Sequence, residues 1–178
     1  MTSHKRLNTA QLQAMDTAHY LHPFTDHKAL GSRGTRIIER AEGVYLWDSE
    51  GNRILDGMAG LWCVNIGYGR SELADAAYKR MLELPYYNSF FQCANEPAIE
   101  LAKALVDVTE ERFNHVFFTN SGSEANEAAL AAALIGRKAN QVLAMRNSYH
   151  GRTFGTVAIT GNVSWKASSN DPFGTHYL

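Results

Sequence analysis

Along the second half of the chain, the spacing of apolar residues changes from a helical period to short, strand-like runs, and this change limits the possible folds. Residues 97–108 repeat apolar side chains at helical spacing, and residues 115–119 form a short β-branched and aromatic run. A small-residue turn, an Ala- and Leu-rich helix over 124–135 ended by Gly136, and a buried strand over 141–145 are expected next. This order predicts an α/β domain, with an incomplete, mostly parallel sheet and flanking helices.

The first part of the chain has a different character. Residues 8–20 predict a helix capped by Asn8 or Thr9, and residues 36–56 predict a small antiparallel meander. Four glycines in residues 57–70 favour an irregular, closely packed loop.

One more helix is expected over 71–84 with Ser71 as its cap, and Asn95 is expected to cap the helix over 97–108. We therefore expect an N-terminal segment over residues 1–70. Residues 71–178 would form the first part of a larger domain.

Composition narrows the classes of partner. Lys and Arg number 17 and Asp and Glu number 18, so the chain carries no basic surface for nucleic acid or an anionic membrane. Cys63 and Cys93 form no CxxC pair and have no His cluster beside them, which predicts a reducing compartment and no metal. No apolar run could span a bilayer or serve as a signal peptide, so a cytoplasmic location is expected.

The most informative motif is Thr-Asn-Ser-Gly-Ser-Glu-Ala-Asn over residues 119–126. A strand would lead into a small-residue turn and then into a helix whose first N–H groups can bind an anion. Gly122 would let a phosphate approach the backbone, and the hydroxyls of Ser121 and Ser123 could add donors. The alternative is that one of these serines only caps the helix. The run is neither a Walker A loop nor a GxGxxG fingerprint.

A second motif, residues 147–153, directly follows the strand expected over 141–145. Ligands of open α/β sheets bind beyond the carboxyl ends of strands, which places the Tyr149 ring over a flat ligand. His150 is either a polar contact or a structural histidine, and Gly151 would give the backbone room.

These motifs and four longer stretches, residues 22–26, 43–48, 56–65 and 84–88, resemble the class III, fold-type I aminotransferases. The likeness runs from about His19 to Gly161 and is greatest to the ω-amino-acid:pyruvate branch. Residues 149–155 lean toward members that act on acetylornithine or 4-aminobutyrate.

The resemblance implies pyridoxal 5'-phosphate (PLP) as cofactor, with Ser121, Gly122 and Ser123 at its phosphate. Tyr149 would stack on its ring, with His150 and Gly151 beside it. It also implies a substrate pocket formed by Phe24, Leu61, Trp62 and, from the partner subunit of a homodimer, Phe90. Without the resemblance, core packing is the simpler reading of Trp62 and Phe90.

The implied reaction moves an amino group from an ω-amino acid or amine to a keto acid such as pyruvate. None of the six lysines matches the family's Schiff-base lysine, so no catalytic residue is assigned and the chain alone is expected not to transaminate. An incomplete sheet also predicts exposed apolar faces and self-association. Two alternatives stay open: other PLP chemistry, such as that of a racemase or mutase, and a non-catalytic interaction protein.

Overall fold

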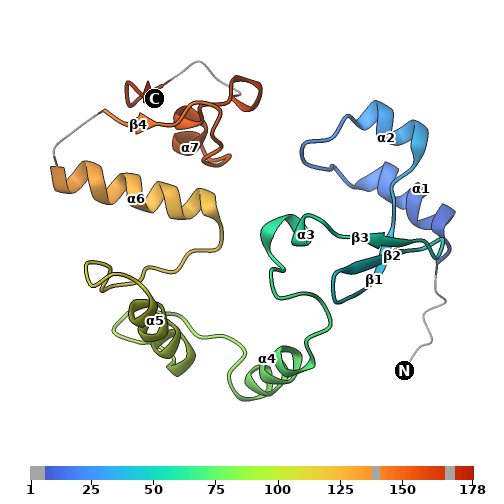
Figure 1. Cartoon of the computed structure of the whole chain (residues 1–178), viewed down its shortest axis with the longest axis horizontal. Coiled ribbons are helices and arrows are strands. Elements are labelled where there is room, and N and C mark those ends of the chain that lie inside the picture. The colour runs from blue at the N-terminus through green and yellow to red at the C-terminus, as the bar shows by residue number, and fades with distance from the viewer. Residues whose placement is uncertain (1–6, 138–140, 167–170) are drawn as a thin grey trace. The chain divides into compact units, whose positions relative to one another are not determined.

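The computed structural model describes residues 7–137, 141–166 and 171–178. The chain divides into two compact units, Met1–Tyr87 and Asn88–Leu178 (Figure 1). The division expected at residue 70 stays a prediction about domain organisation. In the described residues, no helix is both long enough and apolar enough to cross a membrane.

The first unit begins with helices α1 (Thr9–His19) and α2 (His27–Arg33). The α1 prediction is confirmed, with Asn8 as its cap: the Gln11 amide donates to Asn8 Oδ1 at 2.9 Å, and the Asn8 amide donates to Gln11 Oε1 at 3.0 Å. Helix α2 was not predicted. Its signals are the Asp26 carboxylate, which accepts the first N–H groups of α2, and Gly34 at its end.

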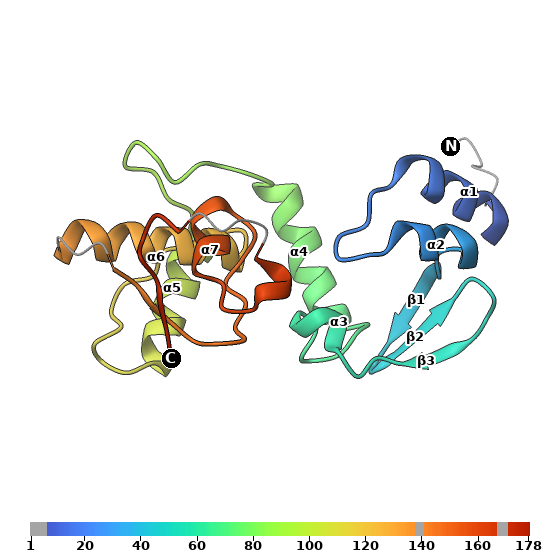
Figure 2. The same cartoon turned by 90° about the horizontal axis from the view of Figure 1, so that it is seen from above.

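The predicted antiparallel meander is confirmed as β1 (Ile38–Glu42), β2 (Tyr45–Asp48) and β3 (Arg53–Leu55), in the order β1-β2-β3 (Figure 2). The β2–β3 turn is built on Asp48, whose carboxylate accepts the amide hydrogens of Glu50 at 3.1 Å and Asn52 at 2.9 Å. The Asn52 side chain also donates to it, and this hydrogen bond lowers the Asp48 pKa below its ordinary value.

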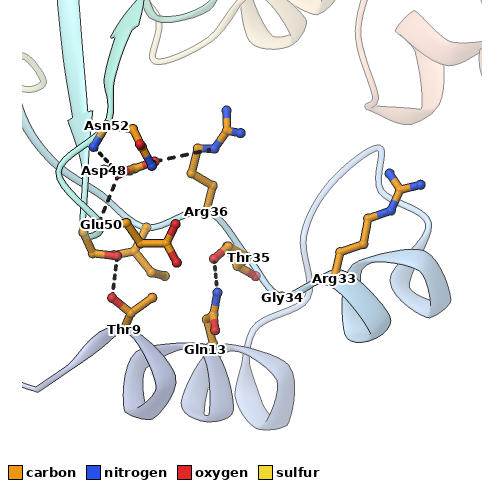
Figure 3. A pocket seen from close by; sticks show the side chains of 11 residues that line it. Thr9, Gln13, Arg33, Gly34, Thr35, Arg36, Asp48, Glu50 and Asn52 are labelled. Atoms are coloured by element: carbon orange, nitrogen blue, oxygen red, sulfur yellow. Dashed lines mark hydrogen bonds and ion pairs between the residues drawn. The ribbon is translucent and has the colours of Figure 1, made fainter.

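Polar contacts tie α1 to this meander across a pocket of about 360 Å³ (Figure 3). Thr9 Oγ1 lies 2.8 Å from Ser49 Oγ in the β2–β3 turn, and Gln13 Nε2 donates to the Thr35 carbonyl at 2.9 Å. None of the predicted site residues lines this pocket. The Thr9–Ser49 contact joins α1 to the β2–β3 turn.

The first unit ends with α3 (Ala59–Trp62) and α4 (Ser71–Glu83). Helix α4 was predicted, but its expected cap, Ser71, is wrong. The helix begins one residue earlier: the Arg70 carbonyl accepts the Leu73 amide at 3.2 Å, which makes Ser71 the first helical residue.

In the second unit, α5 (Glu96–Val108) is confirmed with the predicted cap, because Asn95 Oδ1 accepts the Ala98 amide at 3.1 Å. Helix α6 (Gly122–Arg137) starts before the predicted range and continues through Gly136. The expected stop at Gly136 is wrong, since one glycine costs a helix only about 1 kcal/mol, which an Ala- and Leu-rich segment tolerates.

The second unit contains a two-stranded parallel sheet of β4 (Leu143–Ala144) and β5 (His176–Tyr177). Strand β4 lies within the predicted 141–145 strand. The strand predicted over 115–119 is wrong for this structure: it pairs with no strand in the described residues, and an extended segment without a partner forms no ladder.

The best-buried residues gather at α7 (Phe154–Ile159), which was not predicted and which packs beside α6. Ala158 and Ile159 are buried, and so are Thr156 and Thr160, whose hydroxyls form hydrogen bonds within the segment. A short 3-10 turn, η1 (Val163–Trp165), follows.

Candidate functional site

The N-terminus of α6 combines a completed helix cap with free donors. Ser121 Oγ accepts the Glu124 amide at 3.2 Å, and the Glu124 carboxylate accepts the Asn120 amide at 2.8 Å. In the described part of the chain, the backbone N–H groups of Gly122 and Ser123 have no partner. Those donors lie at the positive end of a 16-residue helix, so the cap and an anion site are compatible here.

The backbone at Gly122 is also open. A Cβ built on this glycine would meet no atom within 4 Å. An anion could therefore approach the free N–H groups without displacing protein atoms, which is the space that a phosphate requires.

The fold brings this turn against the second sequence motif. The Arg152 amide donates to Ser123 Oγ at 3.1 Å across 29 positions of sequence. Gly151 has a φ of +137°, and a Cβ on it would lie 2.5 Å from both Ser123 Oγ and Thr156 Oγ1. Only glycine fits this contact, so Gly151 allows the two motifs to meet.

Two residues that sequence reasoning missed complete the contact. Asn126 Nδ2 donates to the His150 carbonyl at 2.7 Å, and Glu127 Oε1 accepts the amides of Gly155 at 2.9 Å and Thr156 at 3.3 Å. Both side chains come from the first turns of α6, whose sequence is otherwise mostly alanine and leucine. Polar residues inside such an apolar helix were the available signal.

Tyr149 and His150 lie on the segment that α6 holds. Tyr149 is 44% exposed, and its ring stands nearly perpendicular to the Trp165 ring, at 5.4 Å between centroids. His150 Nε2 lies 3.0 Å from Ser148 Oγ, and its amide donates to Thr160 Oγ1 at 3.2 Å. These contacts give His150 a structural role in holding the loop, and a ligand contact for it stays a prediction.

The four expected pocket residues divide between the units. Phe24, Leu61 and Trp62 belong to the first unit and Phe90 to the second. All four are exposed, Trp62 at 78% and Phe90 at 72%. The core-packing reading of Trp62 and Phe90 is therefore wrong for this chain. Among the described residues, no group of three or more His, Cys, Asp or Glu side chains could hold a metal ion.

The sequence and the fold both match known proteins. The sequence profile of aminotransferase class-III matches residues 29–176. Putrescine–pyruvate aminotransferase of Pseudomonas aeruginosa is 55% identical over 159 residues, which cover 86% of this chain and 35% of that protein.

Two solved structures illustrate the shared fold. The thermostable (S)-enantioselective ω-transaminase of Thermomicrobium roseum superposes with a TM-score of 0.92 at 39% identity, over 98% of this chain and 40% of its own. Taurine:2-oxoglutarate aminotransferase of Bifidobacterium kashiwanohense, in complex with PLP and glutamate, superposes with a TM-score of 0.88 at 26% identity, over 98% and 39%.

The chain thus spans between 35% and 40% of the length of these relatives. Class III aminotransferases depend on PLP, and the fold seen here is the one found in fold-type I PLP transaminases. Because the matched profile covers most of the sequence, this chain belongs to the class III aminotransferase family.

Proposed function

We propose that the protein carrying this chain is a PLP-dependent aminotransferase, and that this chain supplies the phosphate and ring contacts of its site. The observation that carries the proposal is the α6 N-terminus, where the Ser123–Arg152 hydrogen bond holds open backbone donors beside the Tyr149 segment. A dianionic phosphate suits this position, because the helix dipole and the unpaired N–H groups both favour negative charge.

Each predicted site residue then has a defined task. Gly122 and Ser123 would donate to the phosphate through their backbone N–H groups, and Ser121 and Ser123 through their hydroxyls. Tyr149 would stack on the pyridine ring, while Gly151 and His150 would keep that segment against α6. When bound, PLP would supply an electron sink for the electron pair that remains on the amine-bearing carbon when its proton leaves.

The proposed substrates are an ω-amino acid or amine as donor and a keto acid such as pyruvate as acceptor. Putrescine–pyruvate aminotransferase, which is 55% identical, supports this class by its name. We propose that Phe24, Leu61 and Trp62 surround the donor and that Phe90 reaches it from the partner subunit of a homodimer. A related ω-transaminase in which glycine replaces a tryptophan was engineered for asymmetric synthesis of enantiopure bulky amines, which supports a tryptophan as a limit on donor size.

Phosphate binding is tested with pyridoxamine phosphate, which lacks an aldehyde and so cannot react with surface lysines. We expect binding that exceeds that of pyridoxamine, and we expect Gly122→Ala to lower the affinity for pyridoxamine phosphate about tenfold, or about 1.4 kcal/mol. The melting temperature should not fall, because the new Cβ meets no protein atom. Gly31→Ala, in α2 of the first unit, is the control: its Cβ also meets no atom within 4 Å, and it should leave binding unchanged.

Equal binding of the phosphorylated and unphosphorylated compounds would contradict the phosphate site. The reaction type is tested by adding β-alanine and then pyruvate to the PLP-loaded protein. Amine-dependent bleaching of the cofactor band, restored by pyruvate, is expected. Racemisation of an amino acid without transfer to pyruvate would instead indicate other PLP chemistry.

We further propose a homodimer and a cytoplasmic location. Phe90 is exposed within its own chain, as a residue that reaches a neighbouring subunit should be. Cys63 and Cys93 are both free thiols, which suits a reducing compartment. Sedimentation of the PLP-loaded protein would measure the assembly.

A further inference from the structure

Helix α3 is a turn of left-handed helix. Its residues Ala59, Gly60, Leu61 and Trp62 have φ values of +48°, +60°, +62° and +69°. The Trp62 amide donates to the Met58 carbonyl at 2.8 Å, and the Cys63 amide donates to the Ala59 carbonyl at 2.9 Å. Side chains of L-residues disfavour this hand, and only one of the four residues is glycine. The turn must therefore be held by groups outside it.

The Asp56 carboxylate is the group that holds the turn. Its Oδ1 accepts the Met58 amide at 3.1 Å, and its Oδ2 accepts both the Gly60 amide at 2.7 Å and the Tyr68 hydroxyl at 2.7 Å. Two N–H groups at the start of the turn therefore bond to one charged side chain. The Tyr68 hydrogen bond lowers the pKa of Asp56, so the carboxylate is ionised at neutral pH.

Both members of this pair are anchored in the meander. The Asp56 amide donates to the Val44 carbonyl at 2.9 Å. Tyr68 pairs with Gly43 through two backbone hydrogen bonds, of 2.8 and 3.1 Å. Backbone hydrogen bonds to the β1–β2 hairpin thus hold the Asp56–Tyr68 pair, and the pair holds the turn.

The space inside the turn is equally restricted. A Cβ on Gly60 would lie 2.8 Å from Val64 Cγ2 and 2.9 Å from the Tyr68 hydroxyl. The backbone can therefore approach Tyr68 this closely only with glycine at position 60. The turn presents Leu61 and Trp62 outward, at 64% and 78% exposure.

We propose that Asp56 and Tyr68 are positioning residues that set donor specificity, by holding the left-handed turn on which Leu61 and Trp62 stand. The inference rests on the proposed function, in which these two side chains limit the size of the amine. Neither Asp56 nor Tyr68 needs to touch the substrate, because they act through the backbone of α3.

The test uses the PLP-loaded protein with Tyr68→Phe and Asp56→Asn. Tyr68→Phe removes one hydrogen bond to the carboxylate, and Asp56→Asn removes its charge and one acceptor oxygen. Asp75→Asn, on the exposed surface of α4, is the matched control. Fluorotryptophan is incorporated, and Trp62→Phe identifies the Trp62 resonance by fluorine NMR. The second readout is kcat/KM for an arylalkylamine relative to β-alanine.

We expect both variants to shift or broaden the Trp62 resonance and to change the kcat/KM ratio by about fivefold or more. The kcat for β-alanine should stay within about twofold of wild type, because the cofactor contacts lie on other residues. Asp75→Asn should change neither readout. A Trp62 resonance that is unchanged in both variants overturns the proposal, and so does a shifted resonance with an unchanged ratio.

Failure of the proposed function gives a different result. A protein that binds PLP but transfers no amine would overturn the transaminase assignment and, with it, the role in specificity. The fluorine spectrum would still report whether Asp56 and Tyr68 hold the turn. If Asp56→Asn fails to fold, Tyr68→Phe, which keeps the carboxylate, decides the outcome.

Discussion

At the scale of single residues, the candidate site depends on atoms that are missing from glycine. Gly122 leaves open space in front of the α6 donors, whereas Gly151 leaves room for two protein hydroxyls that would otherwise overlap a Cβ. Glycine thus has two roles here: at position 122 it leaves space for a ligand, and at position 151 it allows two segments of the protein to pack closely. The two roles separate in experiments, because adding a methyl group has opposite steric consequences at the two positions.

Gly151→Ala should lower the free energy of unfolding by about 1–3 kcal/mol, because the methyl group overlaps Ser123 Oγ and Thr156 Oγ1 and the backbone is left in a region that favours glycine. Urea denaturation measures the change. Gly136→Ala is the control: it lies in the last turn of α6 with nothing within 4 Å, and should raise stability by about 0.5–1 kcal/mol. Equal effects of the two substitutions would contradict the close contact at Gly151.

At the scale of elements, local signals predicted the structure wherever the partner of a segment was also local. The Asn95 cap predicted α5, and successive short apolar runs with a polar turn predicted the meander, because each strand pairs with the next one along the chain. Residues 115–119 have the composition of a strand, but a parallel strand exists only beside a partner distant in sequence. The start of helix α7 is stabilised by Glu127 of α6, whose carboxylate accepts the Gly155 amide from 28 positions earlier in the sequence. No local sequence pattern reveals this contact.

The site shows the same limit. Its turn and its aromatic residue could be read from the motifs, because small residues after a strand and an aromatic after the next strand have defined uses in this kind of fold. Asn126 and Glu127 could not, because their partners, the His150 carbonyl and the start of α7, are set by tertiary packing. The left-handed conformation of α3 could not be predicted either, because Gly60 is the one residue of its four that favours a positive φ.

The β2–β3 hairpin should weaken in acid. The Asp48 pKa is lowered chiefly by its hydrogen bond from Asn52, so the folded chain binds the proton less readily than the unfolded chain does. Stabilisation by this group is therefore complete above its ordinary pKa, near pH 4, and is lost as the pH falls through the lower folded-state value. Thermal unfolding of wild type and Asp48→Asn from pH 6 to pH 3 should show a shallower acid decline in the variant. Identical slopes would exclude Asp48 as a source of the decline.

At the scale of the whole molecule, many large apolar side chains are exposed. In α5, the exposed apolar side chains are Ile99, Leu101, Leu105 and Val108. An apolar groove of about 390 Å³ also lies between α6 and β4, with Leu130, Leu143 and Ile159 in its walls. Folded monomers rarely expose contiguous apolar patches above a few hundred Å². These faces therefore favour contacts with further protein.

The 178-residue chain studied alone should consequently self-associate and bind a hydrophobic dye. It should also form no stable imine between PLP and one of its lysines, since none of them matches the family's catalytic position. Analytical ultracentrifugation and borohydride reduction followed by peptide mapping measure the two outcomes. A monomer with a sharp cooperative unfolding transition would contradict the first expectation, and one uniquely reduced lysine would contradict the second.

The left-handed turn also affects how libraries at positions 61 and 62 should be read. A glycine introduced there removes the side chain and at the same time makes the backbone conformation cheaper, so an observed gain in substrate range has two physical sources. Among residues that have a side chain, asparagine is one of those that best tolerate the left-handed region. Pairing each glycine variant with asparagine and alanine variants would separate pocket volume from backbone freedom, two properties that a simple size series leaves confounded.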